Sequence, residues 1–191
     1  RAFSGVPDTR KSASAPATNA ASGLLDMTAR LIREHRPSAL VACWDADWRP
    51  SWRVELIDSY KQHRVGTGED EQVPDVLQEQ IPLIEALLVG FGVAPVGVPD
   101  FEADDVIGTY ASTATSPVDV VTGDRDLFQL VDDQREVRVL YTARGISRIQ
   151  YVDAAFVQDK YGVEPGQYAD MATLRGDSSD GLPGVVGIGE K

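Results

Sequence analysis

The sequence is poor in the residues that most often carry nucleophilic, redox or zinc chemistry. It contains one cysteine, Cys43, and two histidines among 191 residues. A single cysteine cannot form an internal disulfide, and Cys43 lies in the apolar run 39–44, so we expect a buried, reduced thiol. His35 and His63 lack the spacing of a metal-ligand pair, and we assign them no role.

Positive charge and long apolar runs are also scarce. Lys and Arg number 18 against 30 Asp and Glu, which gives a formal net charge of -12. Phosphate binding is dominated by Lys and Arg, so contact with nucleic acid would depend on local basic patches and bound cations. No apolar stretch approaches the roughly 20 residues of a membrane span, and no secretory leader is visible. We therefore expect a cytoplasmic protein without a membrane partner.

The order of the apolar segments predicts an α/β fold. Apolar segments of strand length alternate with amphipathic helical ones, as in a mostly parallel central sheet flanked by helices. Pro82 is expected to kink one helix and Asp100 to cap another. We predict an α/β core over 1–150 and a helical region over 151–191. The expected helices are 18–36, 74–91 and 100–111, and the expected strands are 38–44, 118–122 and the hairpin pair 137–142 and 146–151.

Carboxylates are abundant where strands end and helices begin. Asp45 follows one expected strand and Asp124 follows another, and ligands of parallel sheets bind outside the carboxyl ends of the strands. Acids gathered there repel one another, and raised pKa values or bound hard cations relieve that repulsion. The sequence therefore predicts a site for two or more divalent ions, with the ligands Asp45, Glu102, Asp104, Asp105, Asp124, Asp126, Asp177 and Asp180.

Each acidic cluster also has a structural interpretation. Asp45 can be a turn former, and acids at 102–105 complement a helix dipole. The stretch 123–126 can be a solvated turn, and 176–181 can be a Ser/Asp loop or a calcium loop, although it lacks the terminal Glu of an EF-hand. Three acids within four residues exceed what the dipole requires. The joint occurrence of the clusters favours the metal site.

The segment 46–73 mixes basic and aromatic side chains. On a helix, Lys61 and Arg64 would share a face, so both could reach one phosphate. The alternative is a solvated amphipathic helix with a tryptophan or two in the core, and for Trp48 and Trp52 alone core burial is favoured.

Five motifs follow one another along the chain. They are Trp44-Asp45, Trp52-Arg53 with Tyr60-Lys61-x-x-Arg64, Glu102-Ala103-Asp104-Asp105, Thr122-Gly123-Asp124-Arg125-Asp126, and Gly176-Asp177-Ser178-Ser179-Asp180-Gly181 continuing to Gly189. In this order they resemble the motifs of the bacterial flap endonuclease family, the 5' nucleases found at the N-terminus of bacterial DNA polymerase I and as stand-alone proteins. The resemblance spans practically the whole chain. It implies a metal-dependent, structure-specific 5' nuclease, both flap endonuclease and 5'-3' exonuclease, that acts in DNA replication and repair.

The same resemblance assigns roles to the acids and to the basic segment. Two or more Mg²⁺ or Mn²⁺ ions are implied. The segment 46–73 corresponds to a helical arch, in which Lys61 and Arg64 grip the scissile phosphate region and Arg53 buttresses the acids. Inner or near-inner ligands are Asp45, Glu102, Asp104, Asp124 and Asp126, whereas Asp105, Asp177 and Asp180 hold waters or a further ion.

The C-terminal glycine-rich stretch corresponds to a helix-hairpin-helix-like turn. In such a turn, backbone N-H groups approach DNA phosphates without reading bases. In relatives it grips the duplex, often with a bound K⁺. A plain glycine-rich helix cap is the alternative for Gly187 and Gly189 taken alone. The DNA-binding residues implied are Gly184, Val186, Gly187, Gly189 and Lys191.

The chain departs from the family pattern in two places. The family opens with a strand ending in Asp-Gly, a principal metal ligand, a few residues before the stretch Arg1-Ala2-Phe3. A protein with only this sequence is expected to bind one metal poorly, whereas a fragment of a longer chain would be unaffected. The family Asn after the last Asp is Gly181 here, which we expect to suit a turn and to be neutral for activity.

Two other functions stay open. A PIN-like ribonuclease places acids on the rim of a similar sheet but lacks the glycine-rich tail. A non-catalytic DNA-junction-binding protein is favoured only if the first strand is truly missing. The partners expected for the leading interpretation are DNA with a 5' flap or 5' single-stranded end and RNA primer-DNA hybrids, bound by a monomer in the bacterial cytoplasm.

Overall fold

The computed structural model describes residues 5–10, 12, 15–65 and 74–189. The backbone divides into two compact units, each made of two stretches of chain. The first unit comprises Arg1–Trp44 and Gly66–Val96, and the second comprises Asp45–Val65 and Gly97–Lys191. Within the described residues, no helix combines the length and the apolar character that crossing a membrane requires.

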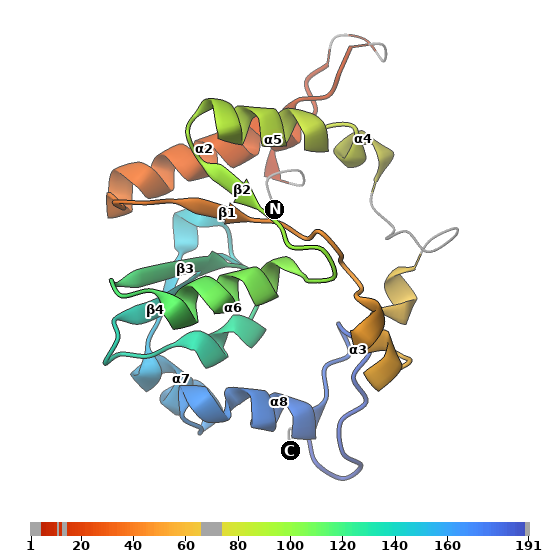
Figure 1. Cartoon of the computed structure of the whole chain (residues 1–191), viewed down its shortest axis with the longest axis vertical. Helices are drawn as coiled ribbons and strands as arrows, with labels where there is room; N and C mark the ends of the chain where they lie inside the picture. The colour runs from red at the N-terminus through yellow and green to blue at the C-terminus, as the bar shows by residue number, and fades with distance from the viewer. Residues whose placement is uncertain (1–4, 11, 13–14, 66–73, 190–191) are drawn as a thin grey trace. The chain divides into compact units, whose positions relative to one another are not determined.

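The first unit packs two helices beside a pair of parallel strands (Figure 1). Val41 pairs with Ala94 and Cys43 with Val96. Small residues at the start of one helix let the second helix approach, and Ile84 and Leu88 fill the space between them. Its elements are α2 (Asn19–His35), β1 (Val41–Cys43), α4 (Asp75–Gln78), α5 (Ile81–Gly90) and β2 (Ala94–Val96).

The expected helix over 74–91 is divided into α4 and α5 in the structure. Pro82 lies in the first turn of α5, where the missing N-H of a proline costs nothing. Gln80, only 1% exposed, lies between the two helices. Its side-chain oxygen accepts a hydrogen bond of 2.9 Å from the backbone N-H of Ala20, and its side-chain nitrogen donates to Asn19. The break therefore places a buried amide where it satisfies the start of α2.

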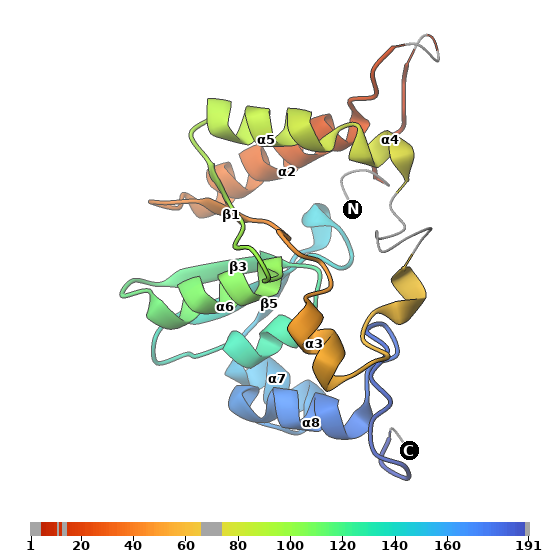
Figure 2. The same cartoon turned by 45° about the vertical axis from the view of Figure 1, so that its right-hand side comes forward.

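The second unit contains a three-stranded mixed sheet with short helices around it (Figure 2). β3 and β4 run parallel, and β4 and β5 run antiparallel. Phe128, fully buried, makes edge contacts with the rings of Tyr141, Phe156 and Tyr168, so one aromatic cluster fills the core. The elements are α3 (Ser51–Leu56), η1 (Gln62–Arg64), α6 (Ala103–Thr113), β3 (Val118–Thr122), η2 (Asp126–Leu130), β4 (Val137–Tyr141), η3 (Ile146–Arg148), β5 (Gln150–Val152), α7 (Ala154–Tyr161), η4 (Pro165–Gln167) and α8 (Tyr168–Arg175).

The α/β class, the helix over 18–36 and the strand over 118–122 are confirmed. The strands expected over 137–142 and 146–151 do pair antiparallel, but the second covers only Gln150–Val152, and Ile146–Arg148 form the 3₁₀ turn η3 instead. The strand expected over 38–44 covers only Val41–Cys43 and is not buried, since Val41 is 37% exposed. The helix expected from Asp100 begins at Ala103. Asp100 adopts a left-handed backbone with φ 65°, and Glu102 takes the capping position. The left-handed backbone of Asp100 and the capping acid at 102 together account for the later start.

Two further expectations concern Trp52 and the division of the chain into domains. Trp52 is exposed, so a core position for it is wrong. The division at residue 150 stays a prediction. The two compact units are a different division, in which residues 45–65 belong with 97–191. The part of the expected arch over 66–73 lies outside the described residues.

Candidate active site

The N-terminus of α6 organises the acidic site. Glu102 caps the helix and forms a capping box with Asp105, whose Oδ2 accepts a 3.0 Å hydrogen bond from the Glu102 N-H. Asp45, from the segment after β1, accepts a 2.7 Å hydrogen bond from the N-H of Ala103 at the same helix end. Both anions lie where the helix dipole is positive. Acids that are distant in sequence therefore meet at one helix terminus.

Glu102 is a buried carboxylate that is held by two consecutive residues, Tyr60 and Lys61. Its side chain is 5% exposed, and Lys61 Nζ lies 2.8 Å from Oε2. The hydroxyl of Tyr60 donates a 2.7 Å hydrogen bond to Oε1. Burial raises the pKa of Tyr60 above its ordinary value, and the hydrogen bond to Glu102 adds to that rise, so the phenol stays a donor. Glu102 is thus fixed from both of its oxygens.

Arg53 forms a bidentate pair with Asp105. The two guanidinium nitrogens lie 2.8 Å from the two carboxylate oxygens. The hydrogen bonds from Arg53 hold the pKa of Asp105 below its usual range. The guanidinium carbon also lies 4.4 Å from the ring centroid of Trp52 and 5.9 Å from that of Tyr60, so aromatic rings help to orient it.

Arg64 joins the C-terminal loop to the segment after α3. Its NH2 donates 2.7 Å hydrogen bonds to Asp180 Oδ1 and to the carbonyl oxygen of Ser179. The backbone N-H of Lys61 donates to the Asp180 carbonyl at 2.9 Å, and the Ser59 hydroxyl donates to the Gly181 carbonyl at 2.7 Å. Residues 59–64 and 179–181 are therefore connected through both side chains and backbone.

The acids Asp104, Asp124 and Asp126, here called the open acids, are arranged differently. Among the residues that the structure describes, no Lys, Arg or His lies within ion-pair distance of them. Burial, and then the charge of Asp124, raise the pKa of Asp104 to about 6. The same two causes, in the same order, raise the pKa of Asp126 to about 6. Asp124 is therefore the acid that both neighbours sense.

The other carboxylates border the open acids. The charges of Asp45 and Glu102 contribute to the raised pKa of Asp104, and those of Asp177 and Asp180 to that of Asp126. Partial burial tends to raise the pKa of Asp177, but hydrogen bonds from Ser179 outweigh it and bring the pKa below its usual value. Seven of the eight predicted acids thus belong to one electrostatic neighbourhood within the second unit, and Asp105 instead interacts mainly with Arg53.

The shared helical face expected for Lys61 and Arg64 is absent. Lys61 precedes the 3₁₀ turn η1 and has a left-handed backbone with φ 49°, which turns its side chain away from that of Arg64. One reaches Glu102 and the other Asp180. Tyr60 received no role in the sequence interpretation, although it belongs to a quoted motif. A tyrosine directly before Lys61 was the available signal, because a buried phenol seeks a hydrogen-bond partner.

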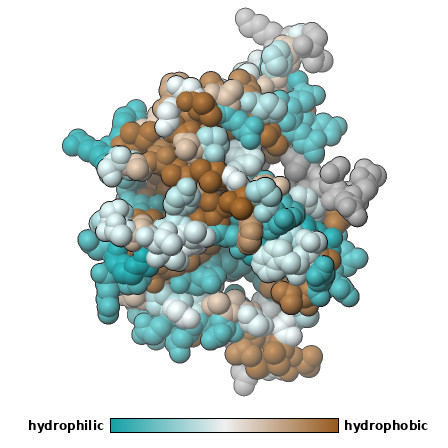
Figure 3. Space-filling view, viewed as in Figure 1, coloured by the Kyte–Doolittle hydropathy of each residue, from teal (hydrophilic) through white to brown (hydrophobic). Residues whose placement is uncertain are grey.

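The C-terminal glycine turn is only partly described, since Lys191 lies outside the described residues. Gly184 and Gly187 have φ of 67° and 86°, the left-handed conformation that glycine allows. The Val185 N-H donates to the Leu174 carbonyl at 2.8 Å, which ties the turn to α8. Val186 is fully exposed, and the apolar patch at the lower edge of Figure 3 lies over this turn. A second helix after it is not part of the described chain.

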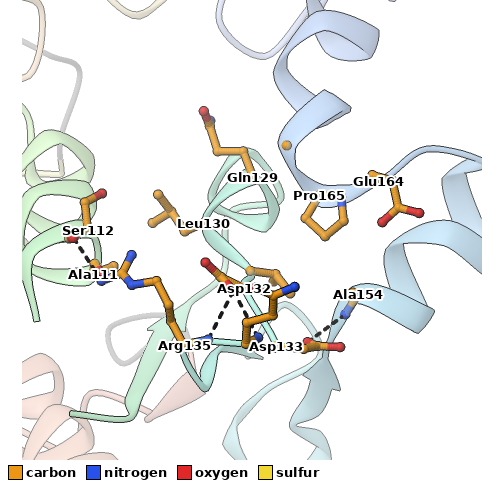
Figure 4. Close-up of a pocket in the computed structure, with 13 residues that line it drawn as sticks. Ala111, Ser112, Gln129, Leu130, Asp132, Asp133, Arg135, Ala154, Glu164 and Pro165 are labelled. Carbon is orange, nitrogen blue, oxygen red and sulfur yellow. Dashed lines mark hydrogen bonds between the residues drawn. The ribbon is translucent and has the colours of Figure 1, made fainter. Parts of the chain in front are cut away.

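A separate pocket lies at the other end of α6. It has a volume of about 490 Å³ and is lined by Ala111, Arg135 and Glu164 among others, with none of the eight acids (Figure 4). The Arg135 guanidinium is engaged, since it donates to the carbonyls of Ala111, Ser112 and Ala114 at the C-terminus of the helix. α6 spans 11 residues, roughly 16 Å, so the pocket and the acids are distinct.

The open acids have the ligand chemistry that a hard divalent cation requires, but their side chains as they stand do not form a complete coordination site. They offer carboxylate oxygens, and their mutual repulsion is the kind that a bound cation relieves. Within the described residues, no three Asp, Glu, His or Cys side chains are close enough to share an ion as they stand. Side-chain rotations would therefore have to complete a coordination shell.

The sequence is similar to those of curated exonucleases. A 5'-3' exonuclease of Streptomyces coelicolor is 60% identical over 196 residues, covering all of this chain and 65% of the relative. A 5'-3' exonuclease of Mycobacterium tuberculosis is 47% identical, covering all of this chain and 64% of the relative. The chain thus spans about two thirds of the length of these curated relatives.

The fold also resembles that of a solved nuclease. The flap endonuclease of bacteriophage T5, in a pseudo-enzyme-product complex with DNA and metal ions, superposes with a TM-score of 0.68 at 16% identity, covering 98% of this chain and 67% of that one. Residues 1–162 match the family described as 5'-3' exonuclease, N-terminal resolvase-like domain. On this match, which covers most of the sequence and both units of the α/β fold, the chain belongs to the 5'-3' exonuclease family.

Proposed function

We propose that this chain is the catalytic part of a divalent-metal-dependent, structure-specific 5' nuclease with flap endonuclease and 5'-3' exonuclease activity. The observation that carries the proposal is the gathering of Asp104, Asp124 and Asp126 from two segments of sequence, with no Lys, Arg or His of the described residues at ion-pair distance. Family membership supplies the reaction class, and relatives named 5'-3' exonuclease support it. Hydrolysis of a phosphodiester needs charge neutralisation that these acids cannot give alone.

Two or more Mg²⁺ or Mn²⁺ ions are proposed as cofactors. Asp45, Glu102, Asp104, Asp124 and Asp126 would hold them directly or nearly so, and Asp177 and Asp180 would hold bound waters or a further ion. Bound divalent ions of this kind activate water and stabilise charge on the attacked phosphate. The T5 relatives solved with metal ions, including zinc, support a metal site in this fold. Asp105 was proposed as a ligand from the sequence, and its pair with Arg53 supports a positioning role instead.

The basic residues are proposed to bind the strand that is cut. Lys61 and Arg64 lie on either side of one turn of chain and can exchange a carboxylate partner for a phosphate, since both anions present similar oxygens. Arg53 is proposed to keep Asp105 and the helix cap in place. Each exchange would leave Glu102 or Asp180 to a metal ion, so binding of phosphate and binding of metal would support each other.

The glycine turn is proposed to bind duplex DNA through backbone N-H groups in a helix-hairpin-helix-like element, with Gly184, Val186, Gly187 and Gly189 at the contact and a K⁺ ion beside it. The left-handed glycines make such a close backbone approach possible. The proposed substrates are DNA with a 5' flap or 5' single-stranded end and RNA primer-DNA hybrids. We propose that the protein works as a monomer in the bacterial cytoplasm.

The test is cleavage by the full-length protein in Mn²⁺ of a labelled 5'-flap duplex, a plain duplex and a single-stranded RNA. Cutting selective for the flap is expected. Cutting restricted to RNA would instead support a PIN-like ribonuclease, and tight flap binding without cutting would support a junction-binding protein. A parallel reaction with excess chelator is expected to show no product.

A further inference from the structure

Two large aromatic side chains are exposed together in the second unit. Trp52 is 37% exposed and Phe101 is 42% exposed, and their ring centroids lie 6.3 Å apart with planes inclined by 54°. The Trp52 indole N-H donates a 3.0 Å hydrogen bond to the carbonyl of Asp100, which fixes its orientation. Aromatic rings of this size usually supply core burial, so an ordered, exposed pair indicates a surface that another molecule covers.

The pair lies at the edge of the acidic site. Phe101 directly precedes Glu102, the buried cap of α6, and Trp52 directly precedes Arg53. Arg53 bridges the two features, because its guanidinium lies over the Trp52 ring at 4.4 Å and also pairs with Asp105. A group bound at the pair would therefore lie next to anything bound at the N-terminus of α6.

We infer that Trp52 and Phe101 form a stacking surface for one unpaired nucleobase of the strand being cut. The inference rests on the proposed function, because that function brings a phosphate to the acids and its base lies one sugar away. Stacking accepts any base, which suits an enzyme that selects structure rather than sequence. Because Arg53 already occupies one side of the Trp52 ring, Phe101 makes the larger contact.

A protein segment is the competing occupant. Leu56, one helical turn after Trp52, is 75% exposed and extends the patch with a purely aliphatic side chain. A protein segment would bury all three side chains and would be indifferent to the bases of the DNA. A nucleobase would need the rings above all and would leave Leu56 with little effect. The two occupants therefore differ in which substitutions matter and in whether the base matters.

The experiment is a cycle between protein and DNA variants. Binding and single-turnover cutting are measured for the full-length protein and its Phe101→Ala variant, on an intact 5' flap and on flaps with one abasic site moved through the nucleotides around the cut. Phe101→Ala is expected to weaken binding about five- to tenfold on the intact flap, and to have no further effect when the abasic site removes the stacked base. Phe101→Tyr should restore binding.

The control is Phe91→Ala, which removes an equally bulky, 70% exposed phenylalanine from the first unit. It is expected to leave binding unchanged, as is Leu56→Ala. Equal losses for Phe101→Ala on intact and abasic flaps at every position would overturn the inference while the proposed function stands. Failure of the unaltered protein to bind or cut any flap would overturn both.

Discussion

The second unit contains two groups of acids, which differ in whether a cationic side chain pairs with them. Glu102, Asp105 and Asp180, here called the paired acids, each bind a cation from the segment 53–64, at distances of 2.7 or 2.8 Å. The open acids Asp104, Asp124 and Asp126 lie beside them without such a partner in the described chain, and two of them have pKa values raised to about 6.

The difference separates two functions within one cluster. A paired acid holds two segments of the chain together, because its cation comes from a segment that is distant in sequence. Both side chains lose rotational freedom when the ion pair forms. An open acid has no cationic partner of this kind and adds repulsion, which a folded protein retains at a functional site. The paired acids therefore build the frame, and the open acids form the part of the site that is available to cations.

Removing the central open acid should have the largest effect. Asp124→Ala is expected to lower single-turnover cleavage about a thousandfold or more, because charge stabilisation by a bound divalent ion supplies several kcal/mol. Thermal stability should stay the same or rise, since Asp124 contributes to the raised pKa of both Asp104 and Asp126.

Asp119→Asn is the matched control, because Asp119 is an acid of the same unit that pairs with Arg138 on the surface of the sheet. Its cleavage rate should stay within about twofold of the unaltered protein, because an exposed ion pair contributes on the order of 1 kcal/mol or less. Cleavage by Asp124→Ala within tenfold of the unaltered protein would remove Asp124 from the reaction.

Removing the cation that pairs with one of the paired acids should instead lower the free energy of unfolding. Lys61→Ala leaves Glu102, 4% exposed, with Tyr60, the helix N-terminus that it caps and Arg53 at 3.8 Å as its remaining partners. The free energy of unfolding should fall by about 3 kcal/mol, as for a buried ion pair that loses one member. Arg64→Ala, whose side chain is 34% exposed, should lose about 1 kcal/mol or less.

The comparison is made by urea unfolding in the presence of chelator, so that no metal ion substitutes for the missing cation. Equal losses for Lys61→Ala and Arg64→Ala would show that the burial of Glu102 does not matter. Lys61→Arg, which keeps the charge, should recover part of the loss.

The sequence indicates which acids to consider but not their division into two groups. Asp45 and Asp124 were singled out because each follows an expected strand of one parallel sheet. The structure places those strands, β1 and β3, in separate sheets, so a shared sheet edge is wrong, and Asp45 meets the N-terminus of α6 instead. Whether an acid is paired depends on the reach of side chains from irregular turns. Lys61 takes a left-handed conformation that no periodic pattern reveals, and it separates two cations that a helix would have placed together.

The helices also differ in how much of their structure the local sequence predicts. The helix over 18–36 has a strong apolar stripe and was predicted to within a residue at each end. The helix over 74–91 was not, because the break depends on Gln80 meeting Asn19 and Ala20 from a remote helix. Tertiary partners of this kind override local propensity.

Loosening the frame at its backbone should have an intermediate effect on stability. Gly181 has φ 76°, and a Cβ there would lie 2.3 Å from the Ser59 carbonyl oxygen. Gly181→Ala should therefore lower the free energy of unfolding by about 2 kcal/mol, through backbone strain and displacement of the loop from Ser59. The positive φ of Gly181 agrees with the expected turn, and its neutrality for activity stays a prediction.

Gly187→Ala tests the effect of backbone strain alone, because Gly187 has φ 86° but a Cβ added there would have no atom within 4 Å. It should lose about 1 kcal/mol. Urea unfolding of the two variants measures the difference, and a loss at Gly187 as large as that at Gly181 would mean that the contact with Ser59 contributes nothing.

The smallest effect expected is a dependence of metal-free stability on pH. A carboxyl whose pKa is higher in the folded protein than in the unfolded chain stabilises the fold at low pH, and this contribution is lost as pH rises through the folded value. Asp104 and Asp126 should therefore destabilise the metal-free protein between about pH 4 and pH 6. Asp105 and Asp177, whose pKa values are lowered, act in the opposite sense and lose their contribution only below pH 4.

Urea midpoints in chelator at pH 4.5, 5.5 and 7 measure this slope, and added Mn²⁺ should stabilise the protein more at pH 7 than at pH 4.5. Asp124→Asn removes the charge that both open neighbours sense, so it should flatten the slope in chelator. A slope unchanged by Asp124→Asn would mean that burial and the bordering carboxylates, and not Asp124, raise the two pKa values. The open acids would then be separate buried carboxyls rather than one interacting group, and the contrast with the paired acids would lose its electrostatic basis.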